Sequence, residues 1–443
     1  MSLTVSVFGT GYLGATHAAG MAELGHTVIG VDVDEAKIER LARGEVPFYE
    51  PGLPELLRKH VESGRLRFTT DASLAAAEAE VHFIGVGTPQ KKGENAADMR
   101  FVDAVIDTLA PQLTRPAVIF GKSTVPVGTA ARLAAKVREL APVGDQAELA
   151  WNPEFLREGF AVEDTLRPDR LVLGVEKGRE GRAEAVAREV YAEILERDTP
   201  FLVTDLATSE LVKVSANAFL ATKISFINAI AEICEVTGAD VAQLADAIGY
   251  DARIGRKFLG AGLGFGGGCL PKDIRAFQAR AGELGVGQAL SFLREVDEIN
   301  LRRREHVVNL VETCAGGSMK GAKVAVLGAA FKPNSDDVRD SPALDAAGRL
   351  HLAGADVKVY DPQARHNAEA VWPTIAFVDS LAEACEGAQV VLVATEWTEF
   401  READPDALAA MVGAKKIIDG RNCLPAEKWI EAGWEYHGLG RFA

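Results

Sequence analysis

The chain has few cysteines, and their spacing fits neither a metal site nor a disulfide framework. Five cysteines occur among 443 residues, an odd and scattered set: Cys234, Cys269, Cys314, Cys385 and Cys423. Disulfide-rich secreted domains and zinc sites need paired or closely spaced cysteines, so we expect no metal and a reducing cytoplasm. The first residues also lack the basic and apolar pattern of a leader peptide, which agrees with that expectation.

An excess of basic residues and a long apolar run are also missing. The sequence has 48 Lys and Arg against 64 Asp and Glu, a formal net charge of −16. Nucleic-acid binding requires a basic surface, so we expect no nucleic-acid partner. No apolar run is long enough to cross a bilayer, so we expect no membrane partner either. Local basic groups can still bind a small anionic substrate.

Glycine is abundant, and its first cluster follows an apolar strand at residues 4–9. The cluster reads Gly9-Thr10-Gly11-Tyr12-Leu13-Gly14, a helical pattern follows it, and a second strand at 27–31 leads to Asp32. Such glycines permit a tight turn, the approach of a pyrophosphate to a helix N-terminus and close packing of helix on strand. The acid suits a ribose diol and would repel a 2′-phosphate, which favours NAD over NADP. The alternative is a glycine turn without a ligand.

Three further side chains are candidates for the same cofactor. Lys37 follows Asp32 and could reach the ribose or a phosphate, or could be an ordinary solvated lysine. Strands expected at 81–86 and 117–120 lead to Thr88 and Thr124. Ligands bind at the carboxyl ends of parallel strands, so both threonines could face the cofactor; helix capping is the alternative.

A second glycine cluster precedes Cys269 and the sequence Pro271-Lys272-Asp273. Proline favours the first turn of a helix, so Cys269 should lie at the positive end of a helix dipole with Lys272 nearby. Both effects favour the thiolate, and Asp273 should lie one helical turn further on. We therefore interpret Cys269 as a candidate nucleophile, against the alternative of a buried structural cysteine.

Two more pairs of polar residues have helical spacing. Glu154 and Glu158 are four residues apart and would share a helix face, as a base and an orienting group or as a solvated pair. Lys213 and Asn217 are also four apart, in an apolar helical stretch from 205 to 238. Together they could stabilise an oxyanion, or they could be a structural pair.

A second long helix is expected at 287–314, with an apolar stripe that faces either the core or another subunit. The strand and helix alternation then begins again, with strands expected at 323–327, 357–360, 390–394 and 416–418. Asp361 corresponds to Asp32, but only Gly328 is left of the glycine fingerprint. We therefore predict a second Rossmann-like domain without ordinary dinucleotide binding. Lys332, Arg339 and Arg421 would suit an anionic ligand at its edge.

These motifs resemble a known family. The glycine fingerprint, Asn152-Pro153-Glu154-Phe155-Leu156, Glu210-Leu211-Val212-Lys213 with Asn217, Phe265-Gly266-Gly267-Gly268-Cys269-Leu270-Pro271-Lys272-Asp273 and Ala330-Phe331-Lys332 are similar to those of the nucleotide-sugar 6-dehydrogenases, the UDP-glucose/GDP-mannose dehydrogenase family. The resemblance covers essentially the whole chain. It implies an α/β fold with two Rossmann-like doubly wound parallel-sheet domains, joined by a central helical region with a long connecting helix. We expect an NAD-binding domain at 1–205, a helical dimerisation domain at 206–315 and a UDP-sugar-binding domain at 316–443.

The resemblance also implies a chemistry: the four-electron oxidation of UDP-glucose to UDP-glucuronate by two NAD molecules in turn. Cys269 would hold the sugar as a thiohemiacetal and then as a thioester. Lys213 and Asn217 would steady the oxyanion, Asp273 and Thr124 would hold a water, and Glu154 would act as the base for hydrolysis. No metal takes part.

Binding residues follow from the same resemblance. The expected cofactor contacts are Gly9, Gly11, Tyr12, Leu13, Gly14, Asp32, Lys37, Thr88, Thr124, Glu158, Lys272 and Arg339. The expected contacts of the nucleotide sugar are Glu154, Phe155, Leu156, Arg157, Glu158, Lys213, Asn217, Arg253, Phe258, Leu259, Gly260, Ala261, Gly262, Gly266, Lys332 and Arg421. Arg253 can come from a neighbouring subunit in such enzymes, which implies a homodimer or a higher homo-oligomer.

Other functions stay open at this point. A relative acting on GDP-mannose or TDP-glucose would share every motif. A two-electron hydroxyacid dehydrogenase would need no nucleophilic cysteine. A non-catalytic NAD-binding regulator would leave Lys213, Asn217, Cys269 and Asp273 without a common purpose.

Overall fold

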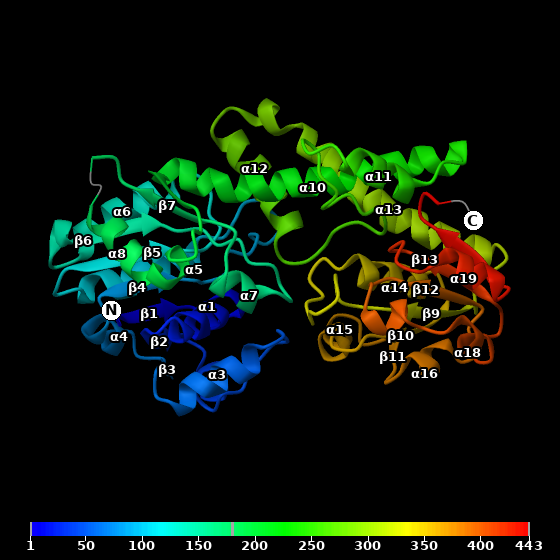
Figure 1. Ribbon diagram of the computed structural model, residues 1–443, viewed down its shortest axis with the longest axis horizontal. Helices are drawn as coiled ribbons and strands as arrows, with labels where there is room; N and C mark the ends of the chain where they lie inside the picture. The colour runs from blue at the N-terminus through cyan, green and yellow to red at the C-terminus, as the bar shows by residue number, and fades with distance from the viewer. Residues whose placement is uncertain (1, 179–180, 442–443) are drawn as a thin grey trace. The chain divides into compact units, whose positions relative to one another are not determined.

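The computed structural model describes residues 2–178 and 181–441, which form two compact units. The first unit comprises Met1–Ala216 with Gly282–Leu284, and the second comprises Asn217–Ala281 with Gly285–Ala443. The boundary falls within α10 (Leu206–Thr237), a single long helix that begins in the first unit and ends in the second (Figure 1).

The first unit is built on a mostly parallel sheet. Within the described residues it has eight strands in the order β3-β2-β1-β4-β5-β6-β7-β8, and only the β6–β7 pair is antiparallel. The strands are β1 (Thr4–Phe8), β2 (Thr27–Val31), β3 (Leu66–Thr69), β4 (Val81–Ile84), β5 (Ala117–Gly121), β6 (Ala147–Trp151), β7 (Leu171–Val175) and β8 (Phe201–Asp205). The order of the first six is that of a dinucleotide-binding sheet.

Helices cover both faces of this sheet because alternate strand residues enter two separate apolar clusters. Val5, Val7 and Phe83 belong to one cluster, while Phe8 and Ile84 belong to the other. Such continuously buried strands are typical of parallel sheets. The helices are α1 (Tyr12–Glu23), α2 (Glu35–Ala42), α3 (Leu53–Glu62), α4 (Ala72–Glu78), α5 (Arg100–Leu109), α6 (Thr129–Leu140), α7 (Ala161–Leu166), α8 (Arg182–Val190) and α9 (Ala192–Leu195).

The second unit begins with a helical region. After the end of α10 come α11 (Val241–Gly249), α12 (Leu270–Glu283) and α13 (Phe292–Cys314). The helix expected from residue 287 starts later, because a short 3₁₀ turn occupies Gly287–Leu290. The apolar stripe of α13 faces inward: Leu293 and Val296 pack against Phe265, while Val307 and Val311 join the core of the following sheet.

A second sheet, entirely parallel, completes this unit. Its order within the described residues is β11-β10-β9-β12-β13-β14, again the Rossmann arrangement, so the expected fold class is confirmed. The strands are β9 (Lys323–Leu327), β10 (Asp356–Tyr360), β11 (Ala376–Phe377), β12 (Val390–Val393), β13 (Lys416–Asp419) and β14 (Glu435–Gly438). The helices are α14 (Pro342–Leu352), α15 (Arg365–Val371), α16 (Leu381–Cys385), α17 (Thr398–Arg401), α18 (Pro405–Ala409) and α19 (Ala426–Glu431).

The three expected domain boundaries stay a prediction, because compactness alone divides the chain into two units. Among the described helices, none combines the length and the apolar character that crossing a membrane demands.

Candidate active site

The turn between β1 and α1 has the form that a pyrophosphate requires. Gly9 has φ +88°, and a Cβ on Gly14 would lie 1.7 Å from the Gly9 carbonyl oxygen, so both positions demand glycine. A Cβ on Gly11 would meet nothing within 4 Å. The backbone at Gly11 is therefore open to a ligand, while its neighbours are packed. These residues fit a bound dinucleotide.

Asp32 follows β2, and its carboxylate faces this turn. It accepts hydrogen bonds from the Thr10 backbone N–H at 2.8 Å and from the Lys37 ammonium at 3.0 Å. Burial alone would raise the pKa of Asp32, but the hydrogen bonds from Thr10 and Lys37 outweigh burial and lower it. Lys37 is thus the ion-pair partner of Asp32. The Asp32 side chain is still 10% exposed, which leaves it accessible to a ribose.

Thr88 and Thr124 lie together at the ends of β4 and β5. The Thr88 hydroxyl donates to the Thr124 carbonyl at 2.7 Å. Neither caps α6, because the N–H groups of Gly128 and Ala130 donate to the carboxylate of Glu210, at 2.7 and 2.6 Å. The capping alternative is therefore wrong for Thr124. Glu210 was noticed only as part of a motif, and its role as the cap of α6 is visible only in the structure.

The helix expected at 154–158 is wrong. Residues 152–157 have no regular structure, a turn follows, and α7 begins only at Ala161. The Glu154 carboxylate accepts from the Leu156 N–H at 2.5 Å, a local bond that competes with helical geometry. Glu154 and Glu158 therefore share no helix face.

Glu50 holds the end of this loop, and no sequence pattern marks it. Its side chain is 1% exposed and accepts from the N–H groups of Gly159 and Ala161 at 2.6 and 2.7 Å. The Tyr12 hydroxyl of the dinucleotide turn donates to the same carboxylate. Burial and this hydrogen bond raise the pKa of Tyr12, so it remains a neutral donor. Glu50 thus joins the cofactor turn to the loop that carries Glu154 and Glu158.

Lys213 pairs with Glu154. The ammonium lies 3.1 Å from Glu154 Oε1, and the two side chains are only 6% and 12% exposed. The Phe155 ring packs against the Lys213 ammonium at 5.6 Å and against the Arg170 guanidinium at 3.9 Å. Arg157 points elsewhere and pairs with Asp164 at 2.6 Å. The structure thus gives Lys213 a carboxylate partner in the expected substrate loop.

Cys269 immediately precedes α12, as the sequence predicted. Its carbonyl accepts from the Asp273 N–H at 2.9 Å, and its side chain is exposed. The other four cysteines are buried or half-buried, and burial raises the pKa of the Cys385 thiol to about 12. Cys269 is therefore the one cysteine of the five that combines exposure with a helix N-terminus, where the thiolate is favoured.

Asp273 bonds to two other candidate site residues near this turn. It is 2% exposed, accepts from the Asn217 amide at 2.6 Å and pairs with Lys272 at 2.6 Å. Asn217 and Lys213 share a helix, but they have different carboxylate partners. Lys272, expected at the cofactor, neutralises Asp273.

The basic residues expected at the second sheet have structural partners. The Arg339 guanidinium donates to both oxygens of Asp337 and lies over Gly268, where a Cβ would be 2.3 Å from Arg339 Cζ. Arg421 donates to the carbonyls of Gly264, Ala394 and Phe331 at 2.8 to 3.2 Å. The Lys332 ammonium lies 5.2 Å from the centre of the Phe331 ring.

The loop at residues 258–262, which precedes Cys269, contains both exposed and buried residues. Phe258 has φ +65° and is 39% exposed, a strained conformation of the kind found at ligand sites. Gly260 is exposed as well, whereas Leu259 and Ala261 belong to the core. The Gly262 N–H donates to Asn228 at 2.9 Å, another buried residue that no motif identified. Arg253 is exposed and pairs with Asp251.

Asp361, the counterpart of Asp32 in the second sheet, is bonded to its own domain. It is 4% exposed, and its carboxylate accepts from the N–H groups of Ala329 and Ala330 at 2.8 and 3.0 Å and from the Trp397 indole at 3.1 Å. Its other oxygen accepts two more backbone N–H groups. No hydrogen-bonding capacity is left for a ribose at this position.

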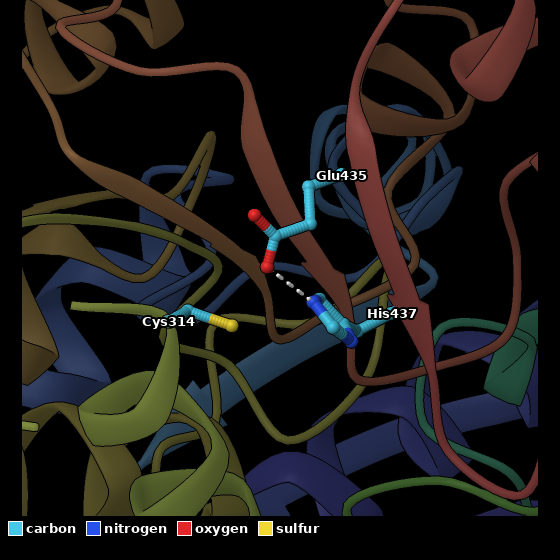
Figure 2. A group of neighbouring side chains, drawn as sticks. All are labelled: Cys314, Glu435 and His437. Atoms are coloured by element: carbon cyan, nitrogen blue, oxygen red, sulfur yellow. Dashed lines mark hydrogen bonds and ion pairs between the residues drawn. The ribbon is translucent and has the colours of Figure 1, made fainter. Parts of the chain in front are cut away.

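One group of potential metal ligands occurs among the described residues. Figure 2 shows Cys314, Glu435 and His437, whose ligand atoms lie within 4.8 Å of one another. Lys416 is already bound there: its ammonium lies 3.4 Å from Glu435 Oε2 and donates to the Cys314 carbonyl at 2.9 Å. Because a protein cation already neutralises the carboxylate, we assign no metal to this group.

Comparisons with known proteins agree along the whole chain. Models of the UDP-glucose/GDP-mannose dehydrogenase family match residues 3–195 (NAD binding domain), 207–302 (central domain) and 325–426 (UDP binding domain). A UDP-glucose 6-dehydrogenase of Rhizobium meliloti is 42% identical over 99% of this chain and 100% of its own length. One from Bacillus subtilis is also 42% identical, over 99% of this chain and 93% of its own.

A solved structure gives the same result in three dimensions. The UDP-glucose dehydrogenase of the archaeon Pyrobaculum islandicum has a TM-score of 0.90 and 39% identity, covering 100% of this chain and 98% of its own. The motifs, both sheets and the full-length relatives agree. The chain therefore belongs to the UDP-glucose/GDP-mannose dehydrogenase family.

Proposed function

We propose that this protein oxidises the primary alcohol of UDP-glucose to the carboxylate of UDP-glucuronate with two molecules of NAD. The observation that carries the proposal is Cys269, an exposed thiol at the start of α12 beside the buried Asp273 and its partners Asn217 and Lys272. An alcohol dehydrogenase that stops at the aldehyde needs no such thiol. The curated relatives named UDP-glucose 6-dehydrogenase support the choice of sugar and base.

The chain's own residues supply binding and proton transfer. NAD, when bound at the Gly9–Gly14 turn and Asp32, accepts a hydride in each of the two oxidations. Between them the Cys269 sulfur adds to the aldehyde carbon and forms a C–S bond. The second oxidation turns this thiohemiacetal into a thioester. Water then breaks the C–S bond, releasing the acid and the thiol.

The remaining roles follow from charge. Lys213 and Asn217 would donate to the oxygen that becomes negative at the tetrahedral stages. Glu154 would accept a proton from the attacking water, and its carboxylate lies in an ion pair with Lys213. Asp273 and Thr124 would hold that water.

Product formation by a Cys269→Ser variant tests the mechanism. Wild-type protein should release two NADH per UDP-glucose. The variant should lose acid formation by a factor on the order of 100 or more, because a serine hydroxyl does not ionise at neutral pH. NADH absorbance and chromatography of the sugar nucleotides measure both quantities. Cys385→Ser is the matched control, since that buried thiol is not among the proposed site residues. Full acid formation by Cys269→Ser would reject the mechanism.

A panel of nucleotide sugars tests the substrate. UDP-glucose should give the highest kcat/KM, ahead of GDP-mannose and TDP-glucose. Faster turnover of either rival would reassign the substrate and would leave the thiol mechanism in place.

We also propose a homodimer formed through α10. Phe219, Phe226 and Ile233 are spaced seven residues apart, lie on one face of the helix and are 66%, 51% and 55% exposed. Large apolar side chains that line up on a surface mark an interaction site, and a second copy of the same helix offers a complementary stripe. A cytoplasmic location likewise remains a prediction from the sequence.

A further inference from the structure

Asp340 lies in the turn before α14 and joins two arginines from two other elements. Its Oδ1 lies 2.9 Å from Arg304 Nη1 on α13, and its Oδ2 accepts from Arg275 Nη1 on α12 at 3.1 Å. Arg304 is only 4% exposed. Arg275 is also held by both carboxylate oxygens of Asp297 on α13, at 2.8 and 3.0 Å. One carboxylate therefore ties together the two helices of this region.

The backbone of the same turn is bound to the glycine loop that leads to Cys269. The Gly267 N–H donates to the Arg339 carbonyl at 2.9 Å. A Cβ on Gly266 would lie 2.3 Å from the Asp340 carbonyl oxygen, so the two backbones are in direct contact. Substrate binding was expected at Gly266, yet the close approach there is made by the protein itself.

The α13 helix holds the residue before these glycines. Asn300 accepts from the Phe265 N–H at 2.7 Å and donates to its carbonyl at 2.9 Å. Arg304 Nη2 also donates to the Phe265 and Asp340 carbonyls, at 3.3 and 3.2 Å. Arg304 thus contacts both the loop and the acid, and a shift of Asp340 would be transmitted to residues two to four positions before Cys269.

The backbone of Asp340 is in the left-handed region, with φ +46°. Of the residues with a side chain, aspartate and asparagine adopt this conformation most readily. Asparagine at position 340 therefore keeps the backbone and the shape of the side chain, but it removes the charge and turns one acceptor oxygen into an NH₂ group that faces an arginine.

We propose that Asp340 is a positioning residue for Cys269. A loop of three consecutive glycines has high conformational entropy, so its fixed geometry requires external restraints. Asp340 supplies them through Arg275, Arg304 and the 339–340 backbone, and touches no reacting atom. The inference rests on the proposed function, in which one sulfur must keep its place through two successive oxidations.

The test compares Asp340→Asn with Asp379→Asn, which removes an exposed carboxylate paired with Arg365. Hydrogen exchange of the peptide containing Phe265 and Gly267 should be about tenfold faster in Asp340→Asn and unchanged in Asp379→Asn, because weaker restraints open the loop more often. The kcat should fall about tenfold, because the sulfur is held less often in its reacting position.

Each other outcome overturns the proposal. Faster hydrogen exchange with a kcat within about twofold of wild type would show that Asp340 only stabilises the loop. A lower kcat with unchanged exchange would show that Asp340 does not act on Cys269 through the loop. If Asp340→Asn does not fold, Arg275→Gln takes its place, with the same expected directions. The exchange experiment needs no substrate. Loop restraint is therefore measured even if UDP-glucose proves not to be oxidised, an outcome that would reject the proposed function instead.

Discussion

At the scale of single residues, Glu50 is a buried acid whose side chain accepts three hydrogen bonds from two separate segments of the chain. Its oxygens accept from the Gly159 and Ala161 N–H groups and from Tyr12. A buried donor or acceptor that loses its partner costs its full desolvation energy. Glu50 therefore determines how firmly the loop carrying Glu154 is attached to the cofactor turn.

Glu50→Gln should lower the free energy of unfolding by about 1–3 kcal/mol, because the new amide NH₂ would face a backbone donor. The loosened loop should also raise the KM for the nucleotide sugar more than the KM for NAD. Urea denaturation and steady-state kinetics measure the two effects. Glu45→Gln, at an exposed acid paired with Arg43, is the control. An equal rise of both KM values would contradict a role confined to the loop.

Single residues were predicted well where a short motif decides their position. The positions of Cys269 and Asp32 are determined by neighbours within a few residues in the sequence. Cys269 lies ahead of a helix and Asp32 lies beside the glycine turn, both as expected. The partner of Lys213 could not be predicted, because Glu154 is distant in sequence and the loop around it was mistaken for a helix. Glu50 and Asp340 carry no pattern, since their roles exist only after folding.

At the scale of secondary-structure elements, Glu235 on α10 bonds to two residues of α13. Its Oε1 lies 2.8 Å from Arg303 and 3.3 Å from His306, and Arg303 is fully buried. Burial alone would raise the pKa of Glu235, but the hydrogen bonds from His306 and Arg303 lower it from 4.5 to about 2. The lowered pKa means that the ionised form stabilises the folded state.

Glu235→Gln should therefore destabilise the protein by about 3 kcal/mol at pH 7, since it leaves a buried guanidinium without its counter-charge. The stabilisation by Glu235 is complete above its unfolded pKa of 4.5 and is lost as the pH falls towards 2. The difference between wild type and variant should shrink from pH 5 to pH 3 in urea titrations. Glu232→Gln, at a more exposed position of α10, is the control. A difference that stays constant with pH would contradict this account.

Elements were predictable where apolar residues run without interruption. The buried strands β1, β2, β9 and β12 match their expected ranges closely. The strand β8 is largely exposed and β11 has two residues, so neither leaves an apolar signal. The prediction for 152–157 failed for a different reason: charged residues at helical spacing are also common outside helices.

At the scale of the whole molecule, the stripe of Phe219, Phe226 and Ile233 predicts the oligomeric state. Phe226→Glu should convert a dimer to a monomer by light scattering, because a charge in the centre of an apolar contact is costly to bury. Leu352→Glu, at a leucine that is 73% exposed on another helix, should leave the mass unchanged. A monomeric wild type, or a variant that stays dimeric, would contradict the proposed interface.

The two sheets share the Rossmann arrangement of strands, but only in the first is the acid after the second strand accessible to a ligand. Asp32 retains some exposure, whereas Asp361 is enclosed by five donors from its own domain. In the proposed mechanism each chain binds NAD at the Gly9–Gly14 turn alone, so a reaction that uses two NAD molecules would pause after the first oxidation. NADH would have to leave and a second NAD to bind while the partly oxidised sugar stays attached to Cys269. A high ratio of NADH to NAD would accordingly hold the enzyme at this intermediate stage.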